Sequence, residues 1–456
     1  MQQFRTAHRL CAVNVMATAG FLGVCLALCC DTAVAQTRDE MVRADRKKVT
    51  EDGFWIYNDL DEAFRQARET GKPILVVLRC IPCHECVKLD DDLVDQDPVI
   101  RPLLDQFVCV RQVSTNGLDL SLFQYDTDQS FAVFMLNADG TVYGRFGTRS
   151  HRTEWFGDVS LEGLAAALQG ALELHTDYPA NRDQLQGKRG RAPEVPSPEQ
   201  YPSLKDRFTD RLNYQGDVAK SCIHCHQIGD AQREFYWAKR QAIPTDVLFP
   251  FPHPKSIGLI LDPESRATVQ EVEAGSLAAA SGLVQGDQIR SMSGQPLLSI
   301  ADVQWALHQA SDTGDRIAVV VEREGKEVSL ELLLPEGWRQ RGDLSWRATS
   351  WTLRRMVTGG MVLEAVDEDI RRKASFPEDT MALRVTYLGQ YGPHAAAKQA
   401  GLQADDVVIA FDGQDQLMTE TAVFDYAVRH RTSGDRVEVV VLRGDQQRTF
   451  SLPMQP

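Results

Sequence analysis

The chain contains two cysteines and a histidine at the spacing of covalent haem attachment. Cys222 and Cys225 are three positions apart, and His226 follows directly, giving a C-x-x-C-H motif. Each thiol can form a thioether bond with one vinyl group of a haem, while the histidine reaches the iron. A tetrahedral zinc site would need two more soft ligands, usually a second cysteine pair, and none lies nearby in the sequence. The motif therefore predicts one haem c.

The second axial ligand of this haem is expected to be His253. No methionine, the common alternative, lies between Met135 and Met292, and His253 is the first histidine after His226. We therefore expect bis-histidine ligation, with an open or remote sixth position as the alternative. His224, inside the motif, is expected to point away from the iron.

A second group of cysteines lies earlier in the chain. Lys72-Pro73 begins an apolar run, which Cys83-His84-Glu85-Cys86 follows after a short interval. This arrangement resembles a thioredoxin-like domain, in which a C-x-x-C pair begins a helix after a buried strand. The resemblance implies that Cys83 is the nucleophile and Cys86 the resolving thiol. A helix N-terminus favours the thiolate, and a thiol one turn later can attack a mixed disulfide.

Other roles for these cysteines remain open. Cys80 is a competing partner, so a Cys80–Cys83 disulfide is an alternative to Cys83–Cys86. A purely structural disulfide is another, and a zinc site that includes Cys109 is a third, although an oxidising compartment disfavours zinc. Cys109 lies in an apolar run and is expected to be a buried core thiol.

The surrounding sequence predicts an α/β unit over residues 50–176 that would position the thiol motif. Helices are expected over 59–70 and 161–174, with another beginning near Cys83. Apolar runs predict strands, and the turn sequence 137–140 joins the last two as a hairpin. The expected strands are 73–78, 107–113, 131–136 and 141–146.

The remaining chain divides by composition. A linker rich in proline and polar residues is expected over 177–203, followed by the haem-binding segment 204–255, which ends in a proline-rich strap. Two copies of a β-rich domain follow, at 256–335 and 358–453. The linker between them, 336–357, is unusually rich in tryptophan and arginine from Trp338 to Trp351. It is expected to pack on a neighbouring domain or to form an interaction surface.

The repeats resemble bacterial PDZ domains. Gly282-Leu283 and Asp287 of the first copy recur as Gly401-Leu402 and Asp406 in the second. The resemblance implies that a loop before the first strand holds a peptide carboxylate with backbone amides, while the strand pairs with the peptide. In the first copy this peptide-binding stretch is Ile257, Gly258, Leu259 and Ile260. In the second copy an insertion at 367–379 obscures the loop, so weak or no binding is expected there. Domains that only pack against their neighbours are the alternative.

Charge and the N-terminus indicate the compartment and exclude one class of partner. The net charge of −15 makes nucleic acid an unlikely partner, and 43% hydrophobic residues suffice for packed cores. Residues 1–35 have a basic start, an apolar run and the cleavage-like Ala33-Val34-Ala35, which predicts a signal peptide and a periplasmic or otherwise exported protein. An uncleaved segment would instead anchor the protein to a membrane.

The whole arrangement is a multidomain α+β protein: a thioredoxin-like domain, a short haem segment and two PDZ domains. This order resembles an exported, planctomycete-type family of thioredoxin-like and PDZ domain (seleno)proteins. The resemblance implies a redox protein, either a thiol–disulfide oxidoreductase or an electron-transfer protein. Its PDZ domains would recruit an exported or membrane protein, and a redox partner protein would exchange electrons with it. A non-catalytic PDZ scaffold with a structural disulfide is the alternative. A serine protease is not expected, since no Gly-x-Ser-Gly-Gly loop precedes the repeats.

Overall fold

The computed structural model describes residues 37–79, 81, 97–129, 131–148, 158–373 and 376–456. The predicted signal peptide and the three cysteines Cys80, Cys83 and Cys86 lie outside these residues.

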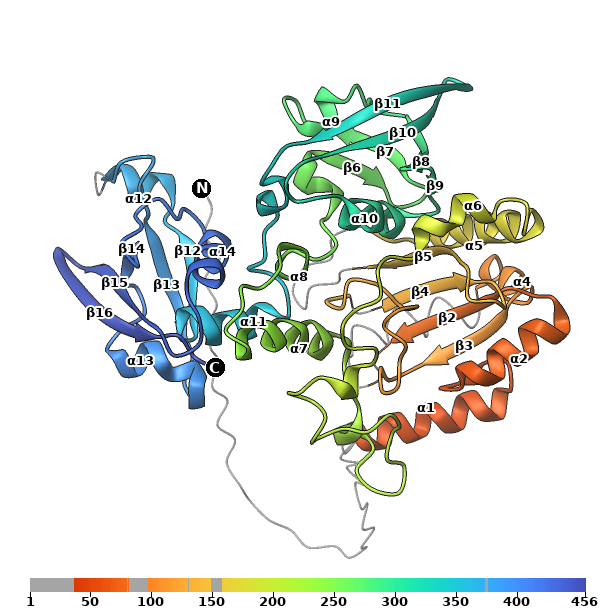
Figure 1. The fold of residues 1–456 in the computed structure, drawn as a ribbon, viewed down its shortest axis with the longest axis horizontal. Helices are drawn as coiled ribbons and strands as arrows, with labels where there is room; N and C mark the ends of the chain where they lie inside the picture. The colour runs from red at the N-terminus through yellow and green to blue at the C-terminus, as the bar shows by residue number, and fades with distance from the viewer. Residues whose placement is uncertain (1–36, 80, 82–96, 130, 149–157, 374–375) are drawn as a thin grey trace, which may run out of the picture. The chain divides into compact units, whose positions relative to one another are not determined.

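The first sheet has five strands in the order β1-β3-β2-β4-β5 (Figure 1). β1 and β2 both run parallel to β3, whereas β4 is antiparallel to β2, and β5 to β4. The carboxyl ends of β2 and β3 therefore meet at one edge of the sheet. The strands are β1 Ile56–Tyr57, β2 Ile74–Arg79, β3 Val108–Gln112, β4 Phe131–Leu136 and β5 Val142–Thr148.

Both faces of this sheet are covered. Every residue of β2, β3 and β4 is buried. Ile74 and Val76 contact one hydrophobic core, while Leu75 and Val77 contact the core on the opposite face. A strand buried on both sides has an unbroken apolar sequence, which is why the sequence predicted these strands correctly.

Two helices lie where the sequence predicted them, at Leu60–Thr70 and Leu161–Thr176, whereas the helices Arg38–Asp52 and Ile100–Leu104 were not predicted. The Asp59 carboxylate accepts the amide of Glu62 at 3.0 Å, and Gly71 ends the same helix with a left-handed φ of 69°. The Ser160 hydroxyl caps a second helix in the same way, through the amide of Gly163 at 2.9 Å. The helices are α1 Arg38–Asp52, α2 Leu60–Thr70, α4 Ile100–Leu104 and α5 Leu161–Thr176.

The segment expected to be a linker, residues 177–203, is instead packed. It contains α6 (Arg182–Leu185), η1 (Gln186–Lys188) and η2 (Pro198–Gln200). The side chain of Lys188 is fully buried. A proline-rich composition indicated a spacer, but contacts with the following domain fix this segment in place.

Helix α7 joins two hydrophobic cores. It runs over Cys225–Ala238, directly after η3 (Ala219–Ser221) and before α8 (Thr245–Leu248) and η4 (Pro254–Ile257). Ile228, near its start, belongs to one core of the first sheet, and Trp237, near its end, belongs to the core of the second repeat. The indole N–H of Trp237 donates to the carbonyl of Gln455 at 2.7 Å.

The two repeats have the same architecture. The first has the strand order β11-β10-β8-β7-β6, with β9 paired to β8, and the second has β12-β13-β14-β15-β16. Each has one short and one longer helix in equivalent places, which are α9 and α10 in the first and α13 and α14 in the second, and the second also contains α12. The elements of the first are β6 Leu259–Asp262, β7 Thr268–Val272, α9 Leu277–Ala280, β8 Gln288–Met292, β9 Gln295–Pro296, α10 Ile300–Gln309, β10 Asp315–Arg323 and β11 Lys326–Leu334. Those of the second are β12 Met361–Ala365, α12 Glu368–Lys373, β13 Leu383–Leu388, η7 Gly392–Ala395, α13 Ala396–Ala400, β14 Val407–Phe411, α14 Glu420–His430, β15 Arg436–Arg443 and β16 Gln446–Pro453.

The same ion-pair geometry occurs in both repeats and explains why these residues recur in the sequence. In the first repeat the guanidinium of Arg323 bonds both carboxylate oxygens of Asp287, at 2.6 and 2.7 Å, and also the carbonyl of Gly282. In the second, Arg443 bonds Asp406 at the same two distances and also bonds the carbonyl of Gly401. The recurring residues therefore form one internal ion-pair network, built twice.

A buried ion pair joins the first domain to the first repeat. Nζ of Lys188 lies 2.8 Å from a carboxylate oxygen of Asp302 on α10, and neither side chain has any exposed surface. Asp302 also accepts the amides of Arg145 on β5, at 3.1 Å, and of Leu298, at 3.0 Å. Burial lowers the pKa of Lys188, and the nearby Asp302 carboxylate opposes that effect. Helix α10 is thereby held directly against β5.

The Trp/Arg segment, residues 338–351, connects three parts of the chain. It includes η5 (Trp338–Arg341) and leads into α11 (Ser350–Leu353) and η6 (Arg354–Thr358). Arg347 is buried and bonds the carboxylates of Asp126 at 2.9 Å and Asp128 at 2.8 Å, both in the first domain. This segment is therefore packed on its neighbours, as its composition suggested.

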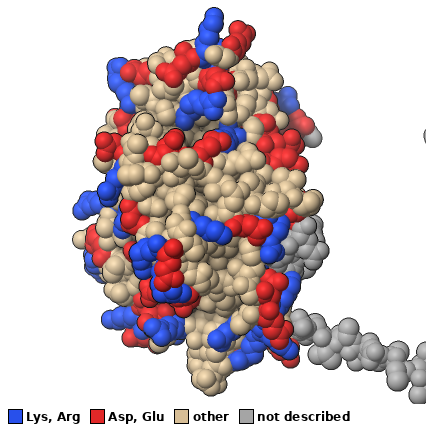
Figure 2. Space-filling view, turned by 90° about the vertical axis from the view of Figure 1, so that its right-hand side faces the viewer, with Lys and Arg blue, Asp and Glu red and all other residues tan. Residues whose placement is uncertain are grey.

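The surface carries both signs of charge. On the face shown in Figure 2, acidic and basic side chains are interspersed, with no extended area of one sign. Across the ranges that the structure describes, no helix combines the length and apolar character needed to span a bilayer.

Replacing Lys188 with methionine should destabilise the protein strongly, because Asp302 would remain buried without its counter-ion. We expect a loss of about 3–5 kcal/mol in the free energy of unfolding, measured by urea denaturation. Arg316→Ala, which removes the exposed Arg316–Glu331 pair, is the matched control and should cost less than about 1 kcal/mol. Equal, small effects of both variants would show that the buried pair does not join the domains.

Candidate functional site

The strand that precedes the predicted thiol motif ends at the carboxyl edge of the first sheet. β2 ends at Arg79, which directly precedes Cys80 in the sequence. The predicted catalytic residues Cys83 and Cys86 lie outside the described residues, so their roles remain predictions. The structure does show the frame that leads into them, which is a buried central strand paired with β3 on one side and β4 on the other.

Two buried arginines share one carboxylate near this edge. Nη1 of Arg111 lies 3.1 Å from Asp45 on α1, and Nη2 of Arg79 lies 3.8 Å from the same oxygen. The guanidinium of Arg111 is also 5.5 Å from the ring centroid of Trp55. The two guanidinium groups and the Asp45 carboxylate thus form one buried charged cluster beside the end of β2.

The C-x-x-C-H segment is fixed to the same edge through the backbone of Ile223. The Ile223 carbonyl accepts the Thr115 hydroxyl at 2.8 Å, and its amide donates to the Asn116 side chain at 2.8 Å. Asn116 in turn donates to the carbonyl of Ser221 at 3.0 Å. Because Thr115 and Asn116 follow β3, the structure brings the C-x-x-C-H segment to the edge of the sheet at which β2 ends with Arg79.

The side chains of this segment face the protein. Cys222 is 5% exposed, and its sulfur lies 3.8 Å from the carbonyl of Val113. Burial raises the pKa of the Cys222 thiol to about 12, so the thiolate is strongly disfavoured. The rings of His224 and His226 stack with their centroids 5.8 Å apart. Burial, followed by the neighbouring His226, lowers the pKa of His224 to about 4.

In this arrangement the residues around the motif do not accommodate a haem. The cavity that Cys222, His224 and Cys225 line has a volume of about 10 Å³, room for roughly one water molecule. The backbone is extended at Cys222 and at His224, so the two thiols do not share the face of a helical turn. His253, the expected second ligand, lines a different pocket together with Lys255 and Trp346. Haem c, with His226 and His253 on the iron, therefore stays a prediction.

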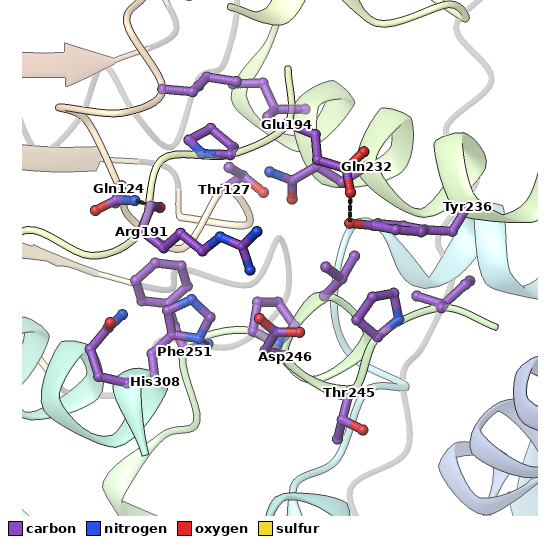
Figure 3. A pocket seen from close by; sticks show the side chains of 18 of the residues that line it. Gln124, Thr127, Arg191, Glu194, Gln232, Tyr236, Thr245, Asp246, Phe251 and His308 are labelled. Carbon is purple, nitrogen blue, oxygen red and sulfur yellow. Dashed lines mark hydrogen bonds between the residues drawn. The ribbon is translucent and has the colours of Figure 1, made fainter. Parts of the chain in front are cut away.

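A larger cavity lies where the first domain, α7, α8 and α10 meet, and we call it the junction cleft. Its volume is about 910 Å³, which lies within the range of small-molecule sites. Figure 3 shows the side chain of Arg191 reaching into the cleft, with Gln232 and Thr127 on one side and His308 on the other. The hydroxyl of Tyr236 donates to Glu194 at the rim, at 3.5 Å.

His308 is held as a neutral side chain in the wall of this cleft. Its ring stacks on Phe251 with centroids 4.1 Å apart, and its Nδ1 accepts the amide of Phe251 at 3.4 Å. Burial, followed by the positive charge of Arg339, lowers the pKa of His308 to about 3.

The predicted peptide-binding residues lie at the edge of the first repeat. β6 is the last strand of its sheet, and its outer edge pairs with no strand among the described residues. Ile257 and Leu259 are buried, whereas Ile260 is half-buried. Gly258 has a φ of 73°, and a Cβ there would lie 2.2 Å from the Cβ of Ser276, so only glycine fits. Its amide donates to the carbonyl of Lys255 at 3.0 Å.

The corresponding loop of the second repeat was not evident from the sequence. Gly360 accepts the amide of Gly389 at 2.9 Å, just as Gly258 accepts that of Glu273 at 2.9 Å. Gly360 is therefore the counterpart of Gly258. The insertion at 367–379, which contains α12, lengthens the connection between β12 and β13 and shifts the spacing that would have revealed this match.

Comparison with known proteins identifies two of the domains. The family described as thioredoxin-like matches residues 55–138, and the PDZ domain family matches residues 255–334. The chain contains a thioredoxin-like domain and a PDZ domain. Together with the sheets described above, these matches confirm the coarse fold expected from the sequence.

Individual relatives are similar over shorter stretches. The periplasmic pH-dependent serine endoprotease DegQ of Escherichia coli (strain K12) is 27% identical over 149 residues, which are 33% of this chain and 29% of DegQ. The chain thus spans less than a third of this curated relative. Among solved structures, the HtrA-type protease AlgW with a tripeptide is 22% identical, with a TM-score of 0.18, over 21% of this chain and 30% of AlgW. A serine endoprotease from Yersinia pestis is 10% identical, with a TM-score of 0.16, over 33% of this chain and 64% of that protein.

The buried position of Cys222 should make its thiol unreactive in the folded protein. Because alkylation requires the thiolate, iodoacetamide at pH 8 should modify Cys222 at least tenfold more slowly than in the urea-unfolded chain. Mass spectrometry of peptides containing Cys222 measures this ratio. Protein exported together with cytochrome c maturation machinery should also be stained for haem. A covalent haem on Cys222 and Cys225 would show that, in the protein that carries haem, this segment moves away from the sheet edge.

Acid should destabilise the protein partly through His308. The unfolded histidine takes up a proton near pH 6.5, whereas the folded one resists protonation down to about pH 3. Stability is therefore lost as the pH falls below 6.5, by about 2 kcal/mol at pH 5 from this residue. His308→Gln should remove that part of the slope in urea denaturation between pH 7 and pH 5. An unchanged slope in His308→Gln would contradict this assignment.

Proposed function

We propose that the protein is an exported thiol–disulfide oxidoreductase whose first PDZ domain recruits protein clients. One observation carries this proposal. The buried central strand of a thioredoxin-like domain ends at Arg79, directly before Cys80 and shortly before the predicted pair Cys83 and Cys86. A predicted signal peptide and the partial similarity to a periplasmic protein support export.

The proposed chemistry uses the two cysteines in sequence. The Cys83 thiolate attacks one sulfur of a client disulfide, whose S–S bond breaks, and the other client sulfur leaves as a thiolate that takes up a proton. The Cys86 thiolate then attacks Cys83 in the mixed disulfide. This releases the second client thiol and leaves a Cys83–Cys86 disulfide, so two electrons have passed to the client. A redox partner protein carrying a dithiol would restore the reduced state, and the reverse sequence would oxidise a client.

Recruitment through the first repeat is supported by the unpaired edge of β6. An extended peptide can add to this edge as a further strand, with its carboxylate near Gly258 and with α10 as the opposite wall. Because the Lys188–Asp302 pair fixes α10 to β5, the groove and the thiol-bearing sheet belong to one body. We also propose that the second repeat is a PDZ domain, supported by its equivalent Arg443–Asp406 network and its Gly360 loop.

A non-catalytic PDZ scaffold is the second candidate. It is favoured by the clamp of Ile223 on Thr115 and Asn116, which places the C-x-x-C-H segment against the carboxyl edge of the sheet. A segment held there takes up space that a client would need beside the thiol motif.

Cys86→Ser should trap clients as mixed disulfides, because the resolving thiol is missing. Non-reducing gels of the exported protein should show adducts that disappear with dithiothreitol, and Cys83→Ser should abolish them. Cys109→Ser is the matched control and should change nothing, since the Cys109 thiol is buried.

The same trap tests recruitment. Adding Ile260→Glu to Cys86→Ser should reduce the adducts severalfold, because a half-buried residue of β6 becomes charged. Adducts that need Cys80 would reassign the redox pair, and a complete lack of adducts would favour the scaffold.

A further inference from the structure

A second pocket, which we call the strap pocket, lies between the proline-rich strap and the Trp/Arg segment. We infer that it binds a small organic carboxylate through the cationic side chains of Lys255 and Arg341, with Trp346 and Phe249 as its apolar walls. Its volume is about 330 Å³, at the small end of the range for ligand sites. This inference is independent of the proposed thiol chemistry.

The charge of the lining is the first observation. Four cationic side chains line the strap pocket, although the chain as a whole has a net charge of −15. The lining contains one carboxylate, that of Asp343, whose oxygens accept the amide and hydroxyl of Ser345 and the hydroxyl of Thr421 at 2.8–2.9 Å. The pocket is therefore a local region of positive potential in an acidic protein.

The partners of the two buried cations are the second observation. Arg347 is neutralised by Asp126 and Asp128. Arg339 is also buried, but it bonds the carbonyls of His308 at 2.7 Å and Ala310 at 2.6 Å, and it forms no ion pair with any described residue. Burial accordingly lowers the pKa of Arg339. Backbone carbonyls, together with the carboxylates of Asp246 and Asp312 beyond ion-pair distance, keep Arg339 charged, and an anion placed nearby is stabilised.

The two exposed cations are the third observation. Lys255 and Arg341 have exposed side chains, and neither forms an ion pair within the described part of the chain. Lys255 is fixed in the turn η4, where its amide donates to Nδ1 of His253 at 3.2 Å. A guanidinium can bind a carboxylate through two parallel N–H bonds, and an ammonium adds a point charge. The two side chains therefore suit one carboxylate group.

The apolar lining indicates the remainder of the ligand. Trp346 is half-buried with the guanidinium of Arg347 5.3 Å from its ring centroid, and Phe249 and two prolines complete the walls. A flat apolar body carrying one carboxylate fits this combination of charge and aromatic surface. Two sources can supply it. One is a free aromatic acid. The other is the C-terminal residue of a peptide, since Lys255 and Ser256 lie directly before the Gly258 loop.

Calorimetric titration of the full chain tests the inference with benzoate, and with benzamide as the neutral isostere. Benzoate should bind, benzamide should bind at least tenfold more weakly, and added salt should weaken benzoate. The double variant Lys255→Glu/Arg341→Glu should weaken benzoate at least tenfold. Both side chains are exposed, so the variant should fold, which circular dichroism verifies. Arg211→Glu is the matched control, because Arg211 is exposed and lies outside the lining.

A second titration distinguishes the two sources of the carboxylate. A short peptide that ends in a free phenylalanine carboxylate is compared with its C-terminal amide. The site is assigned to a peptide terminus if the acid peptide binds more tightly than benzoate and if the double variant weakens that binding. Binding of benzoate alone assigns it to a free acid. Equal binding of benzoate and benzamide, full binding by the charge-reversed variant, or no binding of either acid would overturn the inference.

Discussion

The buried ion pair between Lys188 and Asp302 sets the relation between the first domain and the first repeat. Two charges without contact to water are tolerated when they attract each other at short range and when further hydrogen bonds satisfy the carboxylate. Asp302 meets this condition by accepting the amides of Arg145 and Leu298. A shift of α10 along β5 would break these bonds together, so the pair permits one arrangement of the two domains. Since α10 is also a wall of the proposed peptide groove, the groove has a fixed position relative to the first sheet.

Several other contacts between domains are made by arginine side chains. Arg145 donates to the carbonyls of Gln124 and Lys188, while its guanidinium lies 3.9 Å from the ring centroid of Trp305. Arg347 and Arg354 bind carboxylates in the first domain and in the second repeat, respectively. A planar group with five donors can satisfy carbonyls and carboxylates from several segments at once. This property explains why Arg339 and Arg347 of the Trp/Arg segment are buried, although Arg341 and Trp351 at its surface are exposed. It also explains why the strap pocket, which is built from the same segment, is cationic.

The sequence was most informative where structure depends on neighbouring residues. The strands of the first sheet, the Asp59 cap and the left-handed Gly71 were all predictable, because apolar runs and caps act within a few positions. Lys188 was not predictable, since its partner Asp302 lies more than a hundred positions away and the intervening composition suggested a spacer. The Gly360 loop was obscured by an insertion. The C-x-x-C-H spacing predicts a chemistry, but whether Cys222 faces solvent depends on Val113 and Asn116, which only the fold brings beside it.

Helix α7 has a consequence for how the protein loses its structure. Its first turns complete a core of the thioredoxin-like domain through Ile228, and its last turn completes the core of the second repeat through Trp237, whose indole also bonds the backbone of Gln455. A helix unwinds cooperatively, so neither core can open at α7 without weakening the other. Heating should therefore reveal fewer transitions than the chain has domains. A destabilising substitution near the last residues of α7 should therefore also weaken the packing at the edge of the first sheet, because one continuous helix links the two cores.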